Sequence, residues 1–248
     1  MRIVVLAGIL AGAAAAQSLA TDPPPILQIV RKPGTAAASI RPYANARAEV
    51  NAIGMRGITG LPETWMVEAH YSFASVEDLD QRLAGFGPPS DEAVAPPVTL
   101  IGLYRPAWSF RPAEAVRLLP RARYFNVTIF HVRPGTEGDF GELIRLRRAA
   151  ADAINLDRPD LAFQVVSGAP AGTFVFLAPL QTLRAMDDGV NPVPVYAEGI
   201  VAARQKDGKQ IAADTELSRE HLLFRVDPRI SWVADDFAEI DRDFWRAK

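Results

Sequence analysis

Apolar and polar residues alternate along this chain in two blocks that repeat the same order of predicted elements. In the second block, residues 127–131 read as a strand, and residues 137–154 place apolar side chains at helical spacing. The strand sequences LAFQVVSG and GTFVFLAPL follow, joined by SGAPAG, which is typical of a hairpin turn. The helical stretch PLQTLRAMDDG and the strand within HLLFRVDPRISW complete the block.

The first block carries weaker copies of the same elements. Residues 26–30 read as a strand, and we expect a helix at about residues 42–53, where Pro42 suits a helix start. The strands AIGMRGITG and TWMVEAHYSF, the helix SFASVEDLDQRLAGFG and the strand within VTLIGLYRPAWSF follow. Each block therefore reads β-α-β-β-α-β and ends in a short aromatic stretch.

A Pro-Gly-Thr sequence follows the first strand of each block and sets the alignment between the blocks. Gly34 aligns with Gly135, and Thr136 with Asp139 three residues later predicts a side-chain cap on the following helix. A phosphate-binding loop would need more glycines and a basic residue at the helix start. We therefore interpret the motif as a joint of a duplicated fold.

The order of elements resembles the ferredoxin-like βαββαβ unit. Two such units in tandem resemble the dimeric α+β barrel superfamily, which includes antibiotic-biosynthesis monooxygenases and NIPSNAP-like proteins. The sequences RYFNVTIFHVRPG and DFWRAK also look like those of a group of exported bacterial proteins of uncharacterised activity. The resemblance implies an α+β fold in which tandem ferredoxin-like repeats form an intramolecular dimeric α+β barrel.

The predicted organisation combines this duplication with a leader. The stretch MRIVVLAGILAGAAAAQ has one Arg, an apolar core and small residues at its end, as a secretory signal peptide does. Cleavage after Ala16 is the simplest reading; Ala20 and an uncleaved anchor are alternatives. The predicted segments are a signal peptide (residues 1–16), an extended leader (17–25), a first repeat (26–120), a second repeat (121–234) with a helical insertion at about 193–217, and a C-terminal tail (235–248).

The leader and the amino-acid composition restrict the cellular compartment and the binding partners that we expect for the protein. A leader predicts a periplasmic or secreted protein of the bacterial envelope, and the absence of cysteine rules out disulfides and thiolate sites. A formal net charge of −2 gives no electrostatic footprint for nucleic acid. No run after the leader is long and apolar enough for a membrane helix. We expect a small-molecule partner, and the duplication allows a monomer or a homodimer.

The sequence carries no diagnostic catalytic motif. It contains no G-x-S-x-G elbow, no P-loop and no G-x-G-x-x-G fingerprint. Its three histidines, His70, His131 and His221, are too far apart for a local metal motif, so no metal site is predicted, and a mixed His/carboxylate site assembled by the fold stays open. No cofactor is predicted, and haem or flavin is left open.

Three polar residues interrupt strands that are apolar in the other block. Glu68 and His70 share one face of their strand, whereas the aligned residues are Val175 and Leu177. If they face the barrel interior, they form a candidate catalytic acid/base pair in which the carboxylate orients the ring. His131, aligned with Val30, is a candidate ligand-binding residue. The alternatives are an exposed strand face or a buried histidine satisfied by a neighbouring group.

Further candidate ligand-binding residues lie on two segments. Asn126, Thr128 and Phe130 share one strand face and are predicted to line a barrel cavity. The position of Asn126 resembles that of a strand Asn in some haem-degrading members of the superfamily. In YRPAWSFRP, Arg105 and Trp108 suit an anionic or aromatic ligand, but the echo in FRVDPRISW favours a structural clasp.

These observations leave the function open between classes. The first hypothesis is an exported protein that binds a small, partly apolar ligand in a barrel cavity. The alternatives are a cofactor-independent monooxygenase-like enzyme and a structural or partner-binding envelope protein. The sequence alone does not decide whether the protein is an enzyme.

Overall fold

The computed structural model describes residues 21–34, 50–60, 62–71, 77, 97–187 and 209–247. The strands of the first block are β1 (Ile26–Pro33), β2 (Val50–Gly57), β3 (Glu63–His70) and β4 (Val98–Tyr104). The strands of the second block are β5 (Tyr124–Val132), β6 (Leu161–Ser167), β7 (Thr173–Leu180) and β8 (Glu216–Val226). Both hairpins and all four predicted outer strands are therefore present.

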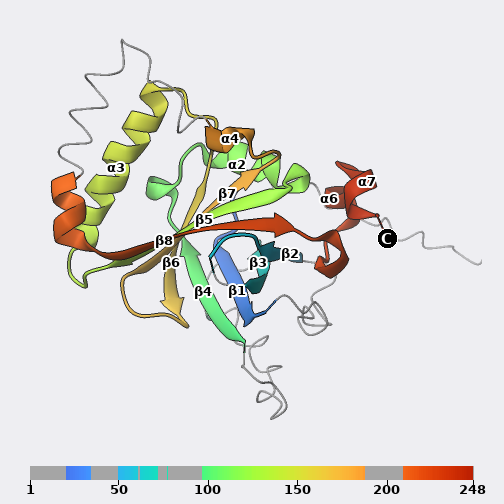
Figure 1. Cartoon of the computed structure of the whole chain (residues 1–248), viewed down its shortest axis with the longest axis horizontal. Helices are drawn as coiled ribbons and strands as arrows, with labels where there is room; N and C mark the ends of the chain where they lie inside the picture. Colours follow the sequence, from blue (N-terminus) through green and yellow to red (C-terminus); the bar gives the residue numbers. More distant parts are fainter. Residues whose placement is uncertain are drawn as a thin grey trace, which may run out of the picture.

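Helices flank the strands (Figure 1). The longest is α3 (Glu137–Ala153), which keeps Phe140, Leu143 and Ile144 buried as its spacing predicts. The shorter helical elements are η3 (Pro106–Trp108), α2 (Pro112–Leu118), η4 (Leu119–Arg121), α4 (Arg184–Asp187), η5 (Pro228–Ile230), α6 (Asp235–Glu239) and α7 (Arg242–Trp245). Residues 209–215 are also helical. In the described part of the chain, no helix combines the length and apolar character needed to cross a membrane.

The eight described strands close into one antiparallel barrel in the order β1-β3-β2-β8-β5-β7-β6-β4. The strands of the first block run β4-β1-β3-β2 around the barrel, and those of the second run β8-β5-β7-β6. The two blocks meet where β2 pairs with β8 and where β4 pairs with β6. Because the ring is closed, the two edge strands of each block pair with edge strands of the other block. The edges of the two sheets are therefore at least partly covered.

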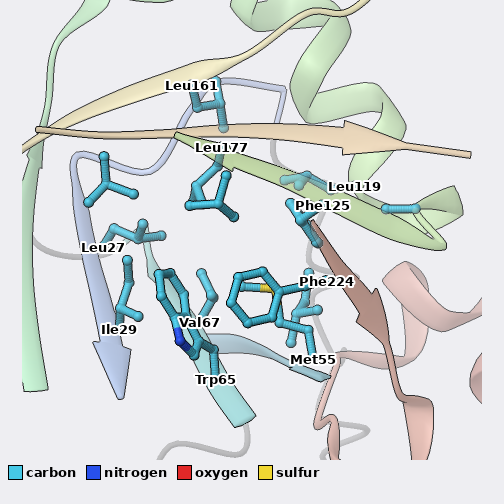
Figure 2. Packing of buried hydrophobic residues seen from close by; sticks show 14 of the residues in the cluster. Leu27, Ile29, Met55, Trp65, Val67, Leu119, Phe125, Leu161, Leu177 and Phe224 are labelled. Carbon is cyan, nitrogen blue, oxygen red and sulfur yellow. The ribbon is translucent and has the colours of Figure 1, made fainter. Parts of the chain in front are cut away.

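Side chains from every strand fill the inside of the barrel (Figure 2). Because side chains alternate between faces, Trp65 and Val67 point inward while Glu68 and His70 point outward. Trp65 is completely buried and contacts the ring of Phe224, with centroids 4.6 Å apart. The predicted barrel cavity is therefore occupied by a packed apolar core.

The C-terminal segment packs against the barrel beside α2 and η4. Trp245 is buried, and its Nε1–H donates to the carbonyl oxygen of Pro120 at 2.6 Å. Phe244 lies beneath the guanidinium of Arg123, 3.8 Å from ring centroid to Cζ. Both aromatic side chains thus attach the tail to η4 and the start of β5.

Two short aromatic tails tie the blocks together by the same set of contacts. After β4, the Ser109 hydroxyl donates to Arg105 O at 3.1 Å and accepts from Ala162 N–H of β6 at 2.9 Å. After β8, the Ser231 hydroxyl donates to Asp227 O at 2.8 Å and accepts from Gly54 N–H of β2 at 2.9 Å. Each tail therefore fastens one block onto a strand of the other.

The second tail also explains a glycine in the middle of β2. A Cβ atom built on Gly54 would lie only 2.4 Å from the carbonyl oxygen of Ile230. The backbones of β2 and η5 thus approach more closely than any side chain at this position permits. Beyond it, Ala52 and Trp232 exchange two backbone hydrogen bonds of 2.8 Å, which continues the attachment along β2.

Three local predictions are corrected by the structure. Residues 50–53, predicted as the end of a helix, belong to β2, because Val50–Gly57 pairs with β3 along its length; residues 42–49 lie outside the described residues. Within the predicted insertion, residues 209–215 are helical, but residues 216–217 already belong to β8. Thr136 occupies the N-cap of α3, yet its hydroxyl donates to Arg133 O at 2.8 Å and makes no cap bond.

We predict that either clasp serine contributes measurably to stability. Ser109→Ala and Ser231→Ala each leave a strand N–H without its acceptor, and we expect each to lower the free energy of unfolding by about 1–3 kcal/mol in urea denaturation. Ser218→Ala, at an exposed position of β8, is the matched control and should change it little. Serine variants as stable as this control would contradict the clasp.

Candidate functional site

The principal pocket lies outside the barrel, between α3 and the outer face of the second block's strands. Its volume is about 500 Å³, within the range of small-molecule sites. Its floor comes from β5, β7 and β8, and its walls come from α3, the tail after β4 and the loop before β6. The lining residues are Trp108, Phe110, Asn126, Thr128, Phe130, Ile144, Arg147, Arg148, Ala151, Leu156, Arg158, Asp160, Phe176, Ala178, Met186, Arg219 and His221.

Strand alternation builds the floor of this pocket. Asn126, Thr128 and Phe130 are the outward residues of β5, because Val127 and Ile129 belong to the barrel core. β8 runs antiparallel beside β5 and places His221 opposite Thr128, with 3.2 Å between His221 Nδ1 and Thr128 Oγ1. The floor therefore combines polar groups along its centre with an aromatic ring at one end.

Two arginines frame that ring. The guanidinium of Arg147 lies 5.0 Å from the centroid of Phe130, and that of Arg219 lies 5.8 Å from it. Arg147 also pairs with Glu216, with 2.6 Å between Nη2 and Oε1. Burial lowers the pKa of Arg147 from its ordinary value, but Glu216 opposes this shift and the group remains a cation. This end of the pocket is thus aromatic and positively charged.

The tail after β4 supplies another wall of the pocket. Trp108 packs edge-on against Phe174 and Phe140, with centroid distances of 4.7 Å and 5.4 Å. Arg148 of α3 donates a hydrogen bond to Ala107 O in the same tail. The first block therefore completes a pocket whose floor belongs to the second block, and the clasp at Ser109 holds this wall in place.

Asp160 is the one carboxyl group among the lining residues. Its Oδ1 accepts the N–H of Phe110 at 3.1 Å, while its own N–H donates to Phe110 O at 2.9 Å. Burial raises the pKa of Asp160 to about 7, and the Phe110 N–H together with Arg148 and Arg158 oppose that rise. The carboxyl group can therefore donate or accept a proton near neutral pH.

His221 is the one imidazole among the lining residues. Burial lowers its pKa from the ordinary value, and the positive charges of Arg219, Arg147 and Arg158 lower it further. The ring is therefore more readily neutral than a free histidine at neutral pH. Together with Asp160 it gives the pocket two groups that exchange protons, both set among arginines.

The structure places four of the predicted ligand-binding residues in this pocket. They are Asn126, Thr128, Phe130 and Trp108. Arg105 lies outside the lining and donates to Gln164 Oε1. His131 lies on the inner side of β5, 3.0 Å from Thr173 Oγ1 and 3.5 Å from Glu220 Oε1, and is not among the lining residues either.

Glu68 and His70 lie far from this pocket, on the outer face of β3. Both are buried, at 2% and 1% exposure, and His70 Nε2 is 3.8 Å from Glu68 Oε2. The register pairs Glu68 with Gln28 of β1, which is also buried. They therefore do not face the barrel interior. The alignment with Val175 is wrong in register, because Val175 points inward and Glu68 outward.

A smaller pocket of about 300 Å³ lies at one end of the barrel. Its inward-facing wall includes the Arg31–Glu63 ion pair, 3.0 Å between Nη2 and Oε1. Trp65 Nε1–H donates to the same carboxylate at 2.6 Å. The charges of Arg31 and Glu63 are therefore engaged with each other, and Glu63 also with Trp65.

Sequence reasoning missed the arginines, Asp160 and His221 as site residues. One signal was available in α3, where the buried face of Leu143 and Ile144 continues into Arg147 and Arg148 one turn later. Asp160 carried no local signal, because its role depends on the tail after β4 reaching the start of β6.

Metal and cofactor chemistry can be compared with these residues. Among the described residues, no three His, Asp or Glu side chains gather closely enough to hold a metal ion. A haem requires an axial ligand and partners for its carboxylates. The lining residues include one imidazole, that of His221, with Nδ1 engaged by Thr128, and four arginines. These residue types are compatible with a haem.

Comparison with known proteins shows similarity of structure only. No protein-family profile and no curated protein sequence matches this chain. An anthrone oxidase-like protein is similar over 82% of this chain and 92% of its own, with a TM-score of 0.49 and 10% identity. A mutant chlorite dismutase from Candidatus Nitrospira defluvii is similar over 90% of this chain and 96% of its own, with a TM-score of 0.47 and 10% identity.

A third similar structure is a "putative monooxygenase" from Lactobacillus acidophilus NCFM, with a TM-score of 0.45 and 9% identity. It covers 81% of this chain and 93% of its own. The likeness of this chain to all three structures is one of fold alone.

We predict that Asp160 makes stability depend on pH. Its folded pKa lies above its ordinary value of 3.8, so the stability present below about pH 4 is lost as pH rises toward 7. Asp160→Asn keeps an acceptor for Phe110 N–H and removes this loss. At pH 8 we expect its Tm to exceed that of the wild type by about 2–4 °C, with no difference near pH 4.

The control is Asp157→Asn, an exposed residue of the same loop. It should follow the wild type at both pH values. An Asp160→Asn protein with an unchanged or lower Tm at pH 8 would show that the Asp160 carboxylate is not destabilising.

Proposed function

We propose that the pocket under α3 binds a small anionic molecule with an aromatic or otherwise apolar body. The observation that carries this proposal is the lining itself, which sets four arginines and one carboxyl group around the rings of Trp108, Phe110, Phe130 and Phe176. Guanidinium groups pair with carboxylate or sulfonate, and they also stack on aromatic faces. The proposed ligand is partly apolar, as in the first hypothesis from the sequence. The proposed site, however, lies outside the packed barrel instead of inside it.

The proposed architecture is a tandem pair of ferredoxin-like βαββαβ units forming an intramolecular barrel. Each block has the same strand order, and the two clasps use corresponding serines. The strand registers then set the Gln28–Glu68 pair of the first block against the Asn126–Ala178 pair of the second. The second block thus carries the pocket residues Asn126 and Ala178 at the positions where the first block carries the buried polar residues Gln28 and Glu68.

The proposed compartment is the bacterial envelope. Residues 1–20 lie outside the described residues, so this proposal depends on the leader pattern and on the absence of cysteine. Detection of the mature N-terminus after Ala16 or Ala20 by mass spectrometry of an expressed full chain supports export. A chain that keeps Met1 in the soluble cytoplasmic fraction contradicts it.

A second candidate function is a cofactor-independent monooxygenase-like enzyme. Asp160 favours it, because a carboxyl group that titrates near neutral pH can accept the proton of a phenolic ligand. An oxygen electrode tests it with a panel of electron-rich phenols. Oxygen uptake that Asp160→Asn abolishes and Asp157→Asn preserves supports the enzyme; absence of uptake with phenols that bind the pocket contradicts it.

Ligand binding is tested with 1-anilinonaphthalene-8-sulfonate and its uncharged analogue N-phenyl-1-naphthylamine. We expect Arg219→Gln to weaken binding of the sulfonate about tenfold, because one charge-assisted contact is lost, and to leave the neutral analogue nearly unaffected. Fluorescence titration measures both affinities.

The matched control is Arg225→Gln. Arg225 lies on the outward face of the same strand, beside Tyr124 and outside the pocket lining. Its variant should bind both probes as the wild type does. Equal sulfonate affinity in the Arg219→Gln and Arg225→Gln proteins would contradict an anion site in this pocket.

A further inference from the structure

We propose that Asp160 couples ligand binding to proton uptake, so that an anion enters the pocket together with a proton on the Asp160 carboxyl group. This inference rests on the proposed anion site and adds its regulation. It follows from the position of Asp160 as the one carboxyl group lining a cavity with four arginines. Arg148 and Arg158, two of these arginines, act on the Asp160 carboxylate, so a ligand anion beside them and the ionised carboxylate compete for the same positive charges.

The backbone holds this carboxyl group in the pocket. Oδ1 accepts the N–H of Phe110, and the N–H of Asp160 donates to Phe110 O. The side chain therefore cannot turn away from an arriving anion without losing a hydrogen bond to the tail. Relief of the repulsion by protonation leaves the geometry unchanged, since a neutral carboxyl group still accepts from Phe110 N–H and can donate to the ligand.

Charged and titratable groups face Asp160 from several elements. Arg148 comes from α3, Arg158 comes from the loop before β6, and Tyr104 comes from β4. His221 of β8 lines the same cavity. Burial raises the pKa of Tyr104 from its ordinary value, so it stays neutral across the relevant range. The arginines stay charged, which leaves Asp160 and His221 as the groups that titrate.

The sign of the effect follows from the charge of each state. Burial raises the pKa of Asp160 to about 7, so both of its forms are populated near neutral pH. An anion bound beside it raises that pKa further, because a like charge disfavours the carboxylate. Anion affinity is therefore highest below about pH 7 and falls above it, by at most about tenfold for each pH unit.

The test is the affinity for 1-anilinonaphthalene-8-sulfonate from about pH 6 to about pH 9, where the sulfonate itself does not titrate. We expect the wild type to lose about tenfold in affinity across this range. Asp160→Asn should bind with the same affinity throughout. Asp157→Asn, the exposed carboxyl control in the same loop, should keep the wild-type dependence.

His221 is separated from Asp160 by its own variant. His221→Gln should retain the pH dependence if Asp160 carries it, and a flat profile in His221→Gln with a sloping one in Asp160→Asn overturns the proposal. Calorimetry of the wild type near pH 7 in buffers of different ionisation enthalpy gives an independent measure. We expect net proton uptake on binding, and zero uptake overturns the coupling even if a variant fails to fold.

The outcomes also separate this inference from the proposed function. Sulfonate binding that is insensitive to Arg219→Gln removes the anion site itself. Binding that depends on Arg219 but is the same from about pH 6 to about pH 9 keeps the site and overturns the proton coupling.

Discussion

The packing of the barrel interior is the constraint on which the rest of the structure depends. Trp65, Phe125, Phe163 and Phe224 are almost completely buried inside a closed ring of strands, in a cluster to which all eight described strands contribute side chains. A core of this density has little room for a ligand and is costly to open, since deleting one large side chain typically costs about 3–5 kcal/mol. Binding chemistry is therefore displaced to the outward residues of the same strands.

The outward face becomes a site only where another element covers it. In the second block, α3 and the tail after β4 cover β5, β7 and β8 and leave a pocket between them. That tail belongs to the first block, and its attachment through Ser109 and Asp160 is what closes the pocket. The attachment of the tail and the geometry of the site thus depend on the same few hydrogen bonds, one of which the Asp160 side chain accepts.

Much of the fold follows from local patterns in the sequence. The helical spacing of Phe140, Leu143 and Ile144 and the turn residues between β6 and β7 are local signals, and the structure contains both elements. The alternation in β5 placed Asn126, Thr128 and Phe130 on one face correctly. These patterns could not predict which face of each strand points into the barrel, because that depends on how strands far apart in the chain close the barrel.

The Pro-Gly-Thr alignment illustrates this limit. It sets Ile29, which points inward, against Phe130, which points outward, so it breaks the alternation that the barrel imposes. Aligning the clasp serines, Ser109 with Ser231, gives a register between the two blocks that keeps this alternation. Asp160 and the arginines were missed for the same reason, since the charge and burial around them come from elements far apart in the chain.

The central claim is that the ligand site lies outside the barrel, under α3. A crystal structure of the full chain soaked with naphthalene-1-sulfonate tests it most directly. The account predicts density for the ring system beside Phe130 and Phe176, with the sulfonate against the pocket arginines. Density at the barrel end beside Arg31 and Glu63, or among the core side chains around Trp65, would contradict it.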